Sequence, residues 1–250
     1  MANIVRKRKQ SRRSSRLDFA SIEVVGGLLP TDTIAQIAAG EASEQSDENY
    51  GIPKGLKLRD EIARYYQIAH AHWERFAATK ADKGSASIVF VQRLLEECFG
   101  YKTLAKSDPK VIADRAFPVN FCAENGRIPV VSAPPALLES RKSGVDEALS
   151  MFGDETRKRS STQLLQEYLN ADEDALWGIT CDGSVLRIMR DNASLTRPAW
   201  IEVNFEKMFT EGLFPDFSAV WLILHASRFG VAGTSPSDCP LERWKERSRV

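Results

Sequence analysis

The hydrophobic residues in the first half of the chain recur mainly at the spacing of an α-helix. In segment 56–78, apolar side chains follow one another every three or four residues, which places them on one face of a helix. A second helix is predicted over 86–99, and Gly100 can end it in a left-handed conformation. The small and charged residues 80–85 between the two helices indicate a boundary between two subdomains. The apolar stripe of the first helix consists of Leu58, Ile62, Tyr65, Ala69, Trp73 and Phe76.

The middle of the chain has the patterns of short strands. Residues 119–122 and 128–131 are rich in β-branched and aromatic side chains, which favours two strands. The pair Asn125-Gly126 between them is typical of a tight hairpin turn. Residues 132–159 are rich in proline, serine and charge and predict a long connection.

A helix and a second hairpin are predicted after this connection. Ser160 and Gln163 have the spacing of a capping box, in which each side chain satisfies a backbone N–H of the other residue. The apolar residues that follow continue a helix to Leu169. Two further strands, 176–181 and 185–190, are joined through Asp182-Gly183, a strong turn signal.

The last elements are one strand and two helices. Residues 200–205 alternate between apolar and polar side chains, as a half-buried strand does. Segment 214–229 is apolar almost all round and predicts a buried helix that contains His225 as a core residue. Residues 240–250 predict a charged, amphipathic helix that ends without a cap, as if more protein should follow.

These patterns together predict an α+β (α/β) fold, with a mixed β-sheet flanked by helices and an N-terminal helical subdomain. The expected organisation is a disordered basic tail at 1–17, the helical subdomain at 18–84, an α/β domain at 85–235, and a charged helix at 236–250 that leads out of the domain.

Charge is unevenly distributed along the 250 residues, although the formal net charge is zero. Segment 1–16 contains basic residues and no acid, so it should not collapse into a core. Such a segment binds nucleic-acid phosphates without sequence preference, or it is a solvated tail with no partner. The basic residues expected to contact DNA here are Arg6, Lys7, Arg8, Lys9, Arg12 and Arg13.

Composition narrows the class of protein further. The four cysteines form no CxxC pair, which excludes a structural zinc site and indicates reduced thiols in a cytoplasmic protein. Apolar stretches fall far short of the roughly 20 residues of a membrane span. The basic N-terminus is not followed by the apolar region of a secretory signal.

Five segments of the second half are distinctive: Ser161–Asn170, Leu176–Gly183, Leu186-Arg187, Leu195–Pro198 and His225–Phe229. Together they resemble the N-terminal region of large type IIG-like restriction–modification methylases, a family whose members also serve as the adenine methylases of several phage-defence operons. The resemblance covers about residues 85–245, and it implies a restriction-endonuclease-like fold of the PD-(D/E)xK type.

An active nuclease of this fold needs an Asp and an acid-x-Lys triplet on neighbouring strands ahead of the capped helix. The two acids hold magnesium, and the lysine helps to activate the attacking water. Between residues 105 and 160 no triplet is well placed. Glu124 is followed by Gly126 in the lysine position, and the triplets 139–141 and 155–157 end in arginine, which cannot lose a proton.

Two other acids, Glu97 and Asp114, remain as candidate metal ligands, although a lone acid is ordinarily a surface residue. The resemblance therefore implies a fold that has lost its chemistry and no metal site in this chain. The sequence lacks the Asn-Pro-Pro-aromatic tetrapeptide of amino-methyltransferases and a glycine-rich loop that could hold S-adenosylmethionine. This cofactor would therefore bind only in a downstream methylase domain.

A second basic cluster, Arg157, Lys158 and Arg159, lies directly before the capped helix. Together with the positive helix end it forms a phosphate clamp, or else it is a solvated loop. Two functions stay open. The first is a catalytically silent domain that contacts double-stranded DNA, a downstream methylase domain or other defence-complex subunits. The second is a magnesium-dependent endonuclease with a divergent active site.

Overall fold

The centre of the fold is a mixed β-sheet of seven strands in the order β1-β9-β8-β7-β6-β5-β2. Neighbouring strands are antiparallel except β6 and β7, which run parallel because α4 connects them. The computed structural model describes residues 18–79, 83–102, 104–123, 127–135, 142–152, 158–191, 199–231 and 233–248. The strands of the sheet are β1 (Ile22–Val25), β2 (Ala105–Lys106), β5 (Phe121–Ala123), β6 (Ile128–Ser132), β7 (Trp177–Cys181), β8 (Val185–Arg190) and β9 (Trp200–Asn204).

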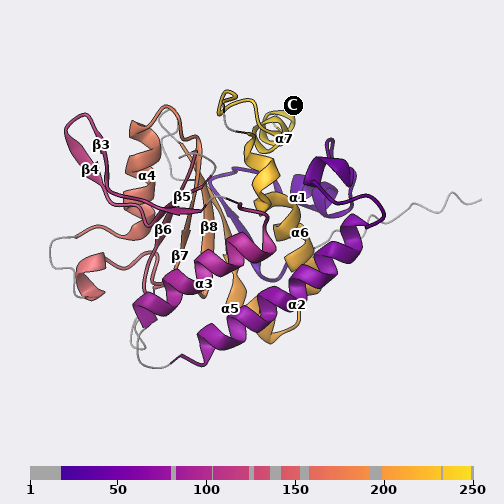
Figure 1. Cartoon of the computed structure of the whole chain (residues 1–250), viewed down its shortest axis with the longest axis horizontal. Helices are drawn as coiled ribbons and strands as arrows, with labels where there is room; N and C mark the ends of the chain where they lie inside the picture. Colours follow the sequence, from indigo (N-terminus) through magenta and orange to yellow (C-terminus); the bar gives the residue numbers. More distant parts are fainter. Residues whose placement is uncertain are drawn as a thin grey trace, which may run out of the picture.

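Helices cover both faces of this sheet. Figure 1 shows α2 and α3 crossing the front side by side, while the ribbon formed by β3 (Lys110–Ile112) and β4 (Arg115–Phe117) projects from the body. The helices are α1 (Thr31–Ala38), α2 (Leu58–Ala77), α3 (Lys83–Cys98), α4 (Ser161–Ala171), α5 (Phe205–Thr210), α6 (Phe214–Leu224) and α7 (Pro240–Arg247). Short 3₁₀ helices are η1 (Glu48–Tyr50), η2 (Leu149–Phe152) and η3 (Ala226–Phe229).

Two hydrophobic clusters lie on the two faces of the sheet. The larger cluster joins Ile179 and Ile188 of the sheet to the apolar sides of α1, α2, α3, α5 and α6. The smaller cluster packs Leu165 and Tyr168 of α4 against Val131 and other side chains. Burial of these apolar surfaces is the main term that holds helices and sheet together.

Most of the predicted elements are confirmed. The long amphipathic helix is α2, and its apolar stripe packs against the larger cluster. The helix before Gly100 is α3, and Gly100 has a φ of +76°. Both reciprocal hydrogen bonds of the capping box at Ser160 and Gln163 are present at the start of α4. The mixed sheet with flanking helices is the predicted fold class.

One predicted helix is shorter than expected. α6 ends at Leu224, and His225 has an extended ψ of 137°, after which η3 begins. The prediction that His225 lies inside a helix is therefore wrong. Its side chain accepts a hydrogen bond from the backbone N–H of Ser227, so it caps η3 and breaks the helical run.

The two ends of the described chain differ from the expected organisation. Segment 18–84 contributes β1 to the edge of the sheet and shares the larger cluster, so it is not purely helical. The charged helix expected to lead out of the domain packs on it instead. Leu241 and Trp244 of α7 are buried, and the Trp244 indole N–H donates to the carbonyl of Ser43 at 2.9 Å.

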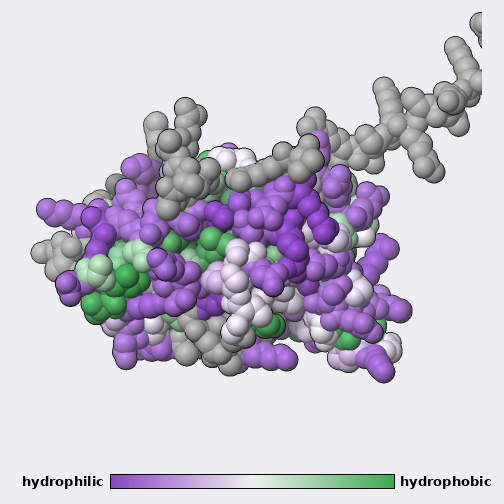
Figure 2. Space-filling view, turned by 90° about the horizontal axis from the view of Figure 1, so that it is seen from above, coloured by the Kyte–Doolittle hydropathy of each residue, from purple (hydrophilic) through white to green (hydrophobic). Residues whose placement is uncertain are grey.

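The surface is mainly hydrophilic on the face shown in Figure 2, where apolar residues appear in limited patches. In the parts of the chain that the structure describes, no helix has the length and apolar character needed to cross a bilayer. Exposed large apolar side chains include Val89 and Val111, on α3 and on the projecting ribbon.

Candidate functional site

The two strands directly ahead of α4 are β5 and β6, where the nuclease resemblance requires the metal-binding acids. Asn120 precedes β5, and its Oδ1 accepts a hydrogen bond from the backbone N–H of Ser132 at 2.6 Å. The Ser132 hydroxyl lies 3.2 Å from the Ser87 hydroxyl on α3. Ser87 also donates to the carbonyl of Ala133 at 2.7 Å. Uncharged side chains thus connect the two strands and α3 at this position.

A cavity of about 560 Å³ lies beside Asn120, between α3 and the strands β2 and β5. None of the residues that line it is an acid; its described lining consists of Ile88, Gln92, Lys106, Ser107, Pro109, Pro118, Val119, Asn120 and Phe121. An amide, a hydroxyl and an ammonium group suit an anion or a neutral polar group better than Mg²⁺, which prefers carboxylate oxygens.

Glu97 and Asp114, the two described acids among the three proposed as metal ligands, are not brought together. Glu97, at the end of α3, has its Oε2 2.7 Å from Nε2 of the buried His72, which fixes α3 to α2. Asp114 is exposed in the turn of the projecting ribbon, with a φ of +62°. Glu124 and the triplets 139–141 and 155–157 lie outside the described residues. Across the described ranges, no cluster of three His, Cys, Asp or Glu side chains is arranged to hold a metal ion.

The basic residues before α4 lie at an exposed corner. Lys158 and Arg159 are exposed, and Arg159 pairs with Glu167 on α4. Arg115, at the start of β4, pairs with the same carboxylate. Two arginines therefore share one carboxylate here, and Lys158 directly precedes one of them in the chain. Arg157 lies outside the described residues, as do the tail residues Arg6, Lys7, Arg8, Lys9, Arg12 and Arg13.

The start of α4 contributes less to an anion site than the sequence suggested. The backbone N–H of Thr162 donates to the carbonyl of Val145 at 3.2 Å, and that of Gln163 donates to the Ser160 hydroxyl at 3.2 Å. These two N–H groups already have acceptors, so they are not available to a phosphate. Any phosphate contact here therefore depends on the basic side chains.

Sequence reasoning missed a buried ionic network beneath α4. Arg187 of β8 is only 5% exposed, and its two terminal nitrogens donate to Asp146 at 2.5 and 2.7 Å. Its Nε donates to Glu202 at 2.7 Å, and its guanidinium lies 4.4 Å from the ring of Trp200. The sequence feature that could have indicated this network is an arginine in the middle of an apolar strand.

This network sets the ionisation of Asp146. Burial alone would raise the pKa of Asp146, but the hydrogen bonds from Arg187 lower it below its ordinary value. Arg187 also donates to the Thr162 hydroxyl at 2.9 Å, so the network links segment 142–152 to α4 and the sheet. The hydrogen-bonding groups of Arg187 bind other residues of the network and not a ligand, which favours a structural role for the network.

The thiols and His225 are poor nucleophiles in this environment. Burial raises the pKa of all four cysteines, and that of Cys98 reaches about 12, so they stay protonated near neutral pH. Burial, together with the nearby Arg228 guanidinium, lowers the pKa of His225 to about 3. His225 is therefore neutral at physiological pH, and its Nδ1 lies 2.8 Å from the Ser227 hydroxyl.

Comparisons with known proteins identify no relative: no protein-family model, no curated protein and no solved structure matches the chain significantly.

Proposed function

We propose that this chain is a catalytically silent, nuclease-like domain that binds double-stranded DNA, and that it belongs to a restriction–modification or phage-defence adenine methylase as its N-terminal part. The observation that carries the proposal is the pair Asn120 and Ser132. Asn120 directly precedes β5 and Ser132 ends β6, the neighbouring strands ahead of the capped helix on which the resemblance requires acids, and the Asn120 side chain accepts a hydrogen bond from the backbone N–H of Ser132. A domain with this arrangement contributes binding and positioning, while chemistry resides in a downstream methylase domain.

The element order supports the same proposal. A helix, a hairpin of two strands, a capped crossover helix and a second hairpin occur in this order as α3, β5–β6, α4 and β7–β8, with β2 and the β3–β4 ribbon inserted between α3 and β5 and η2 inserted between β6 and α4. That is the order which the resemblance to the nuclease-like region requires. The cytoplasm, where such enzymes meet DNA, is the expected location.

DNA binding is supported by the charges at the corner before α4. Arg115 and Arg159 share the single carboxylate of Glu167, and the exposed Lys158 directly precedes Arg159, so the positive charges of these residues outnumber the one carboxylate. Contacts of Lys and Arg with phosphates supply affinity that is independent of base sequence and falls with salt. The basic tail adds contacts of the same kind.

Fluorescence anisotropy with a labelled DNA duplex tests this proposal. Replacing Lys158 and Arg159 together by Ala should weaken binding to unrelated duplexes by the same factor, and should reduce the log–log salt slope by about 0.9 for each phosphate that is no longer neutralised. Lys54→Ala, an exposed lysine ahead of α2, is the matched control and should bind as the parent does. A parent protein that fails to bind duplex DNA would refute the proposal.

A further inference from the structure

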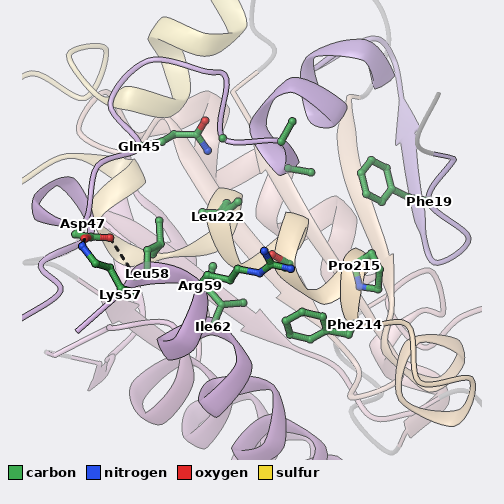
Figure 3. A pocket seen from close by; sticks show the side chains of 14 residues that line it. Phe19, Gln45, Asp47, Lys57, Leu58, Arg59, Ile62, Phe214, Pro215 and Leu222 are labelled. Atoms are coloured by element: carbon green, nitrogen blue, oxygen red, sulfur yellow. Dashed lines mark hydrogen bonds and ion pairs between the residues drawn. The ribbon is translucent and has the colours of Figure 1, made fainter. Parts of the chain in front are cut away.

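A cavity of about 610 Å³ opens between the end of α1, the start of α2 and the start of α6 (Figure 3). Its volume is within the range of about 300–1,000 Å³ that is usual for small-molecule sites. The walls are largely apolar and include Phe19, Ile62, Phe214 and Leu222. None of the described residues that line the cavity belongs to α4 or to the β5–β6 hairpin, so the cavity is distinct from the basic corner before α4.

The wall formed by the segment after α1 is fixed by polar side chains. The Gln45 side chain accepts from the backbone N–H of Ala42 at 2.9 Å and donates to the carbonyl of Ile37 at 2.8 Å. Behind it, Arg228 is 1% exposed and donates to the carbonyls of Glu44 and Asn49, each at 2.7 Å. The cavity is therefore built into the fold before any ligand arrives.

The other two walls are held in the same way. Both the backbone N–H and the hydroxyl of Ser21 donate to the Asp216 carboxylate at 2.7 Å, which ties the segment of Phe19 to α6. Asp47 accepts from the backbone N–H of Leu58 at 3.0 Å and pairs with Lys57 at 3.4 Å. The charges of Asp47 and Lys57 therefore balance each other.

Arg59 is the third charged residue in the described lining of the cavity, and no other lining residue balances its charge. Its guanidinium has no hydrogen-bond or ion-pair partner among the residues that the structure describes. In Figure 3 its side chain reaches across the cavity toward Phe214 and Pro215. A guanidinium beside apolar walls is suited to a carboxylate, because its paired N–H groups match the two carboxylate oxygens.

We propose that this cavity binds a small, mostly apolar molecule with one anionic group, such as a medium-chain or aromatic carboxylate. The apolar body lies between Phe19, Phe214 and Ile62, and the carboxylate accepts two hydrogen bonds from Arg59. A neutral molecule of the same shape lacks the second contact and binds more weakly.

Displacement of the fluorescent aromatic anion 8-anilinonaphthalene-1-sulfonate from the full chain tests the site, with octanoate and octanol as competitors. The probe should bind at one saturable site, and octanoate should displace it at a concentration about tenfold lower than octanol does. Arg59→Gln should remove this preference without changing the octanol result. Arg59→Lys, which keeps the charge but loses the paired N–H groups, should retain part of it.

Arg75→Gln is the matched control, because Arg75 is an exposed arginine of α2 outside this cavity. It should leave the affinities for the probe and for both competitors unchanged, and melting curves should show that all variants are folded. The proposal is overturned if no saturable binding occurs, if octanol competes as well as octanoate, or if Arg75→Gln weakens binding as much as Arg59→Gln.

Discussion

Gly183→Ala should destabilise the protein through a contact between two distant parts of the chain. Gly183 lies in the turn between β7 and β8 with a φ of +95°, and a Cβ built there would lie 2.1 Å from Cζ of Phe76 on α2. The Phe76 ring stacks on Phe90 with ring centroids 5.1 Å apart, so moving it away from the new Cβ would disturb that stack. The substitution therefore combines backbone strain with a steric clash.

The expected cost follows from these two terms. The left-handed conformation costs a residue with a Cβ about 1–2 kcal/mol, and overpacking of a well-filled site costs about 1–3 kcal/mol. Gly183→Ala should thus lower the free energy of unfolding by about 2–5 kcal/mol in urea titrations. Gly212→Ala isolates the strain, because Gly212 has a φ of +67° and nothing lies within 4 Å of its built Cβ.

A double-mutant cycle identifies the clash itself. In a Phe76→Ala background the ring is gone, so Gly183→Ala should cost only about as much as Gly212→Ala, a coupling of about 1–3 kcal/mol. If Gly183→Ala is no worse than Gly212→Ala in the parent, or if Phe76→Ala rescues nothing, then α2 does not pack on this turn and the assembly of helices and sheet described above is wrong.

Three further predictions concern the core, an ionic pair and the tail. Trp177→Ala should cost about 3–5 kcal/mol in thermal melts because Trp177 is 2% exposed, whereas Ser160→Ala should cost about 1 kcal/mol because it removes a helix cap; equal melting temperatures would contradict this order. Burial raises the pKa of Glu242, but hydrogen bonds from Arg190 and Lys245 lower it below the unfolded value of 4.5. The stability it contributes is thus present above that pH and lost below it, so melts from neutral to acid pH should decline more steeply for the parent than for Glu242→Gln. Deleting residues 1–16 should weaken DNA binding and flatten its salt dependence, and an unchanged slope would assign the tail no DNA contact.

Elements with strong local signals could be predicted from the sequence. The stripe of α2, the Ser160 capping box and the turn after Asp182 depend on neighbouring residues only, and the structure contains each of them. β1 was missed because it is a four-residue strand whose only partner in the sheet, β9, is far along the chain. The break at His225 was missed because an apolar run gives no sign of where the backbone leaves the helix.

The candidate site was predictable only in part. The sequence ahead of the capped helix contains no well-placed acid triplet, and the three imperfect ones lie outside the described residues. The sequence could not reveal that the Asn120 side chain binds the backbone of Ser132, because that contact depends on the register of β5 and β6. Arg187 lies in an apolar strand, where burial of an unpaired charge would be costly. Its position therefore indicates a buried acidic partner, but the sequence does not show that the partners are Asp146 and Glu202. Long-range partners of this kind follow from the fold and not from local pattern.

The domain is proposed here to bind DNA without cutting it. Incubating supercoiled plasmid with the purified chain and Mg²⁺ or Mn²⁺, and running the sample on a gel before and after removing the protein, measures both properties at once. The plasmid is expected to be retarded and to be still fully supercoiled once the protein is removed. Nicked or linear plasmid that no longer forms when the metal is chelated would contradict the silent site at Asn120 and Ser132, and plasmid that is never retarded would contradict DNA binding.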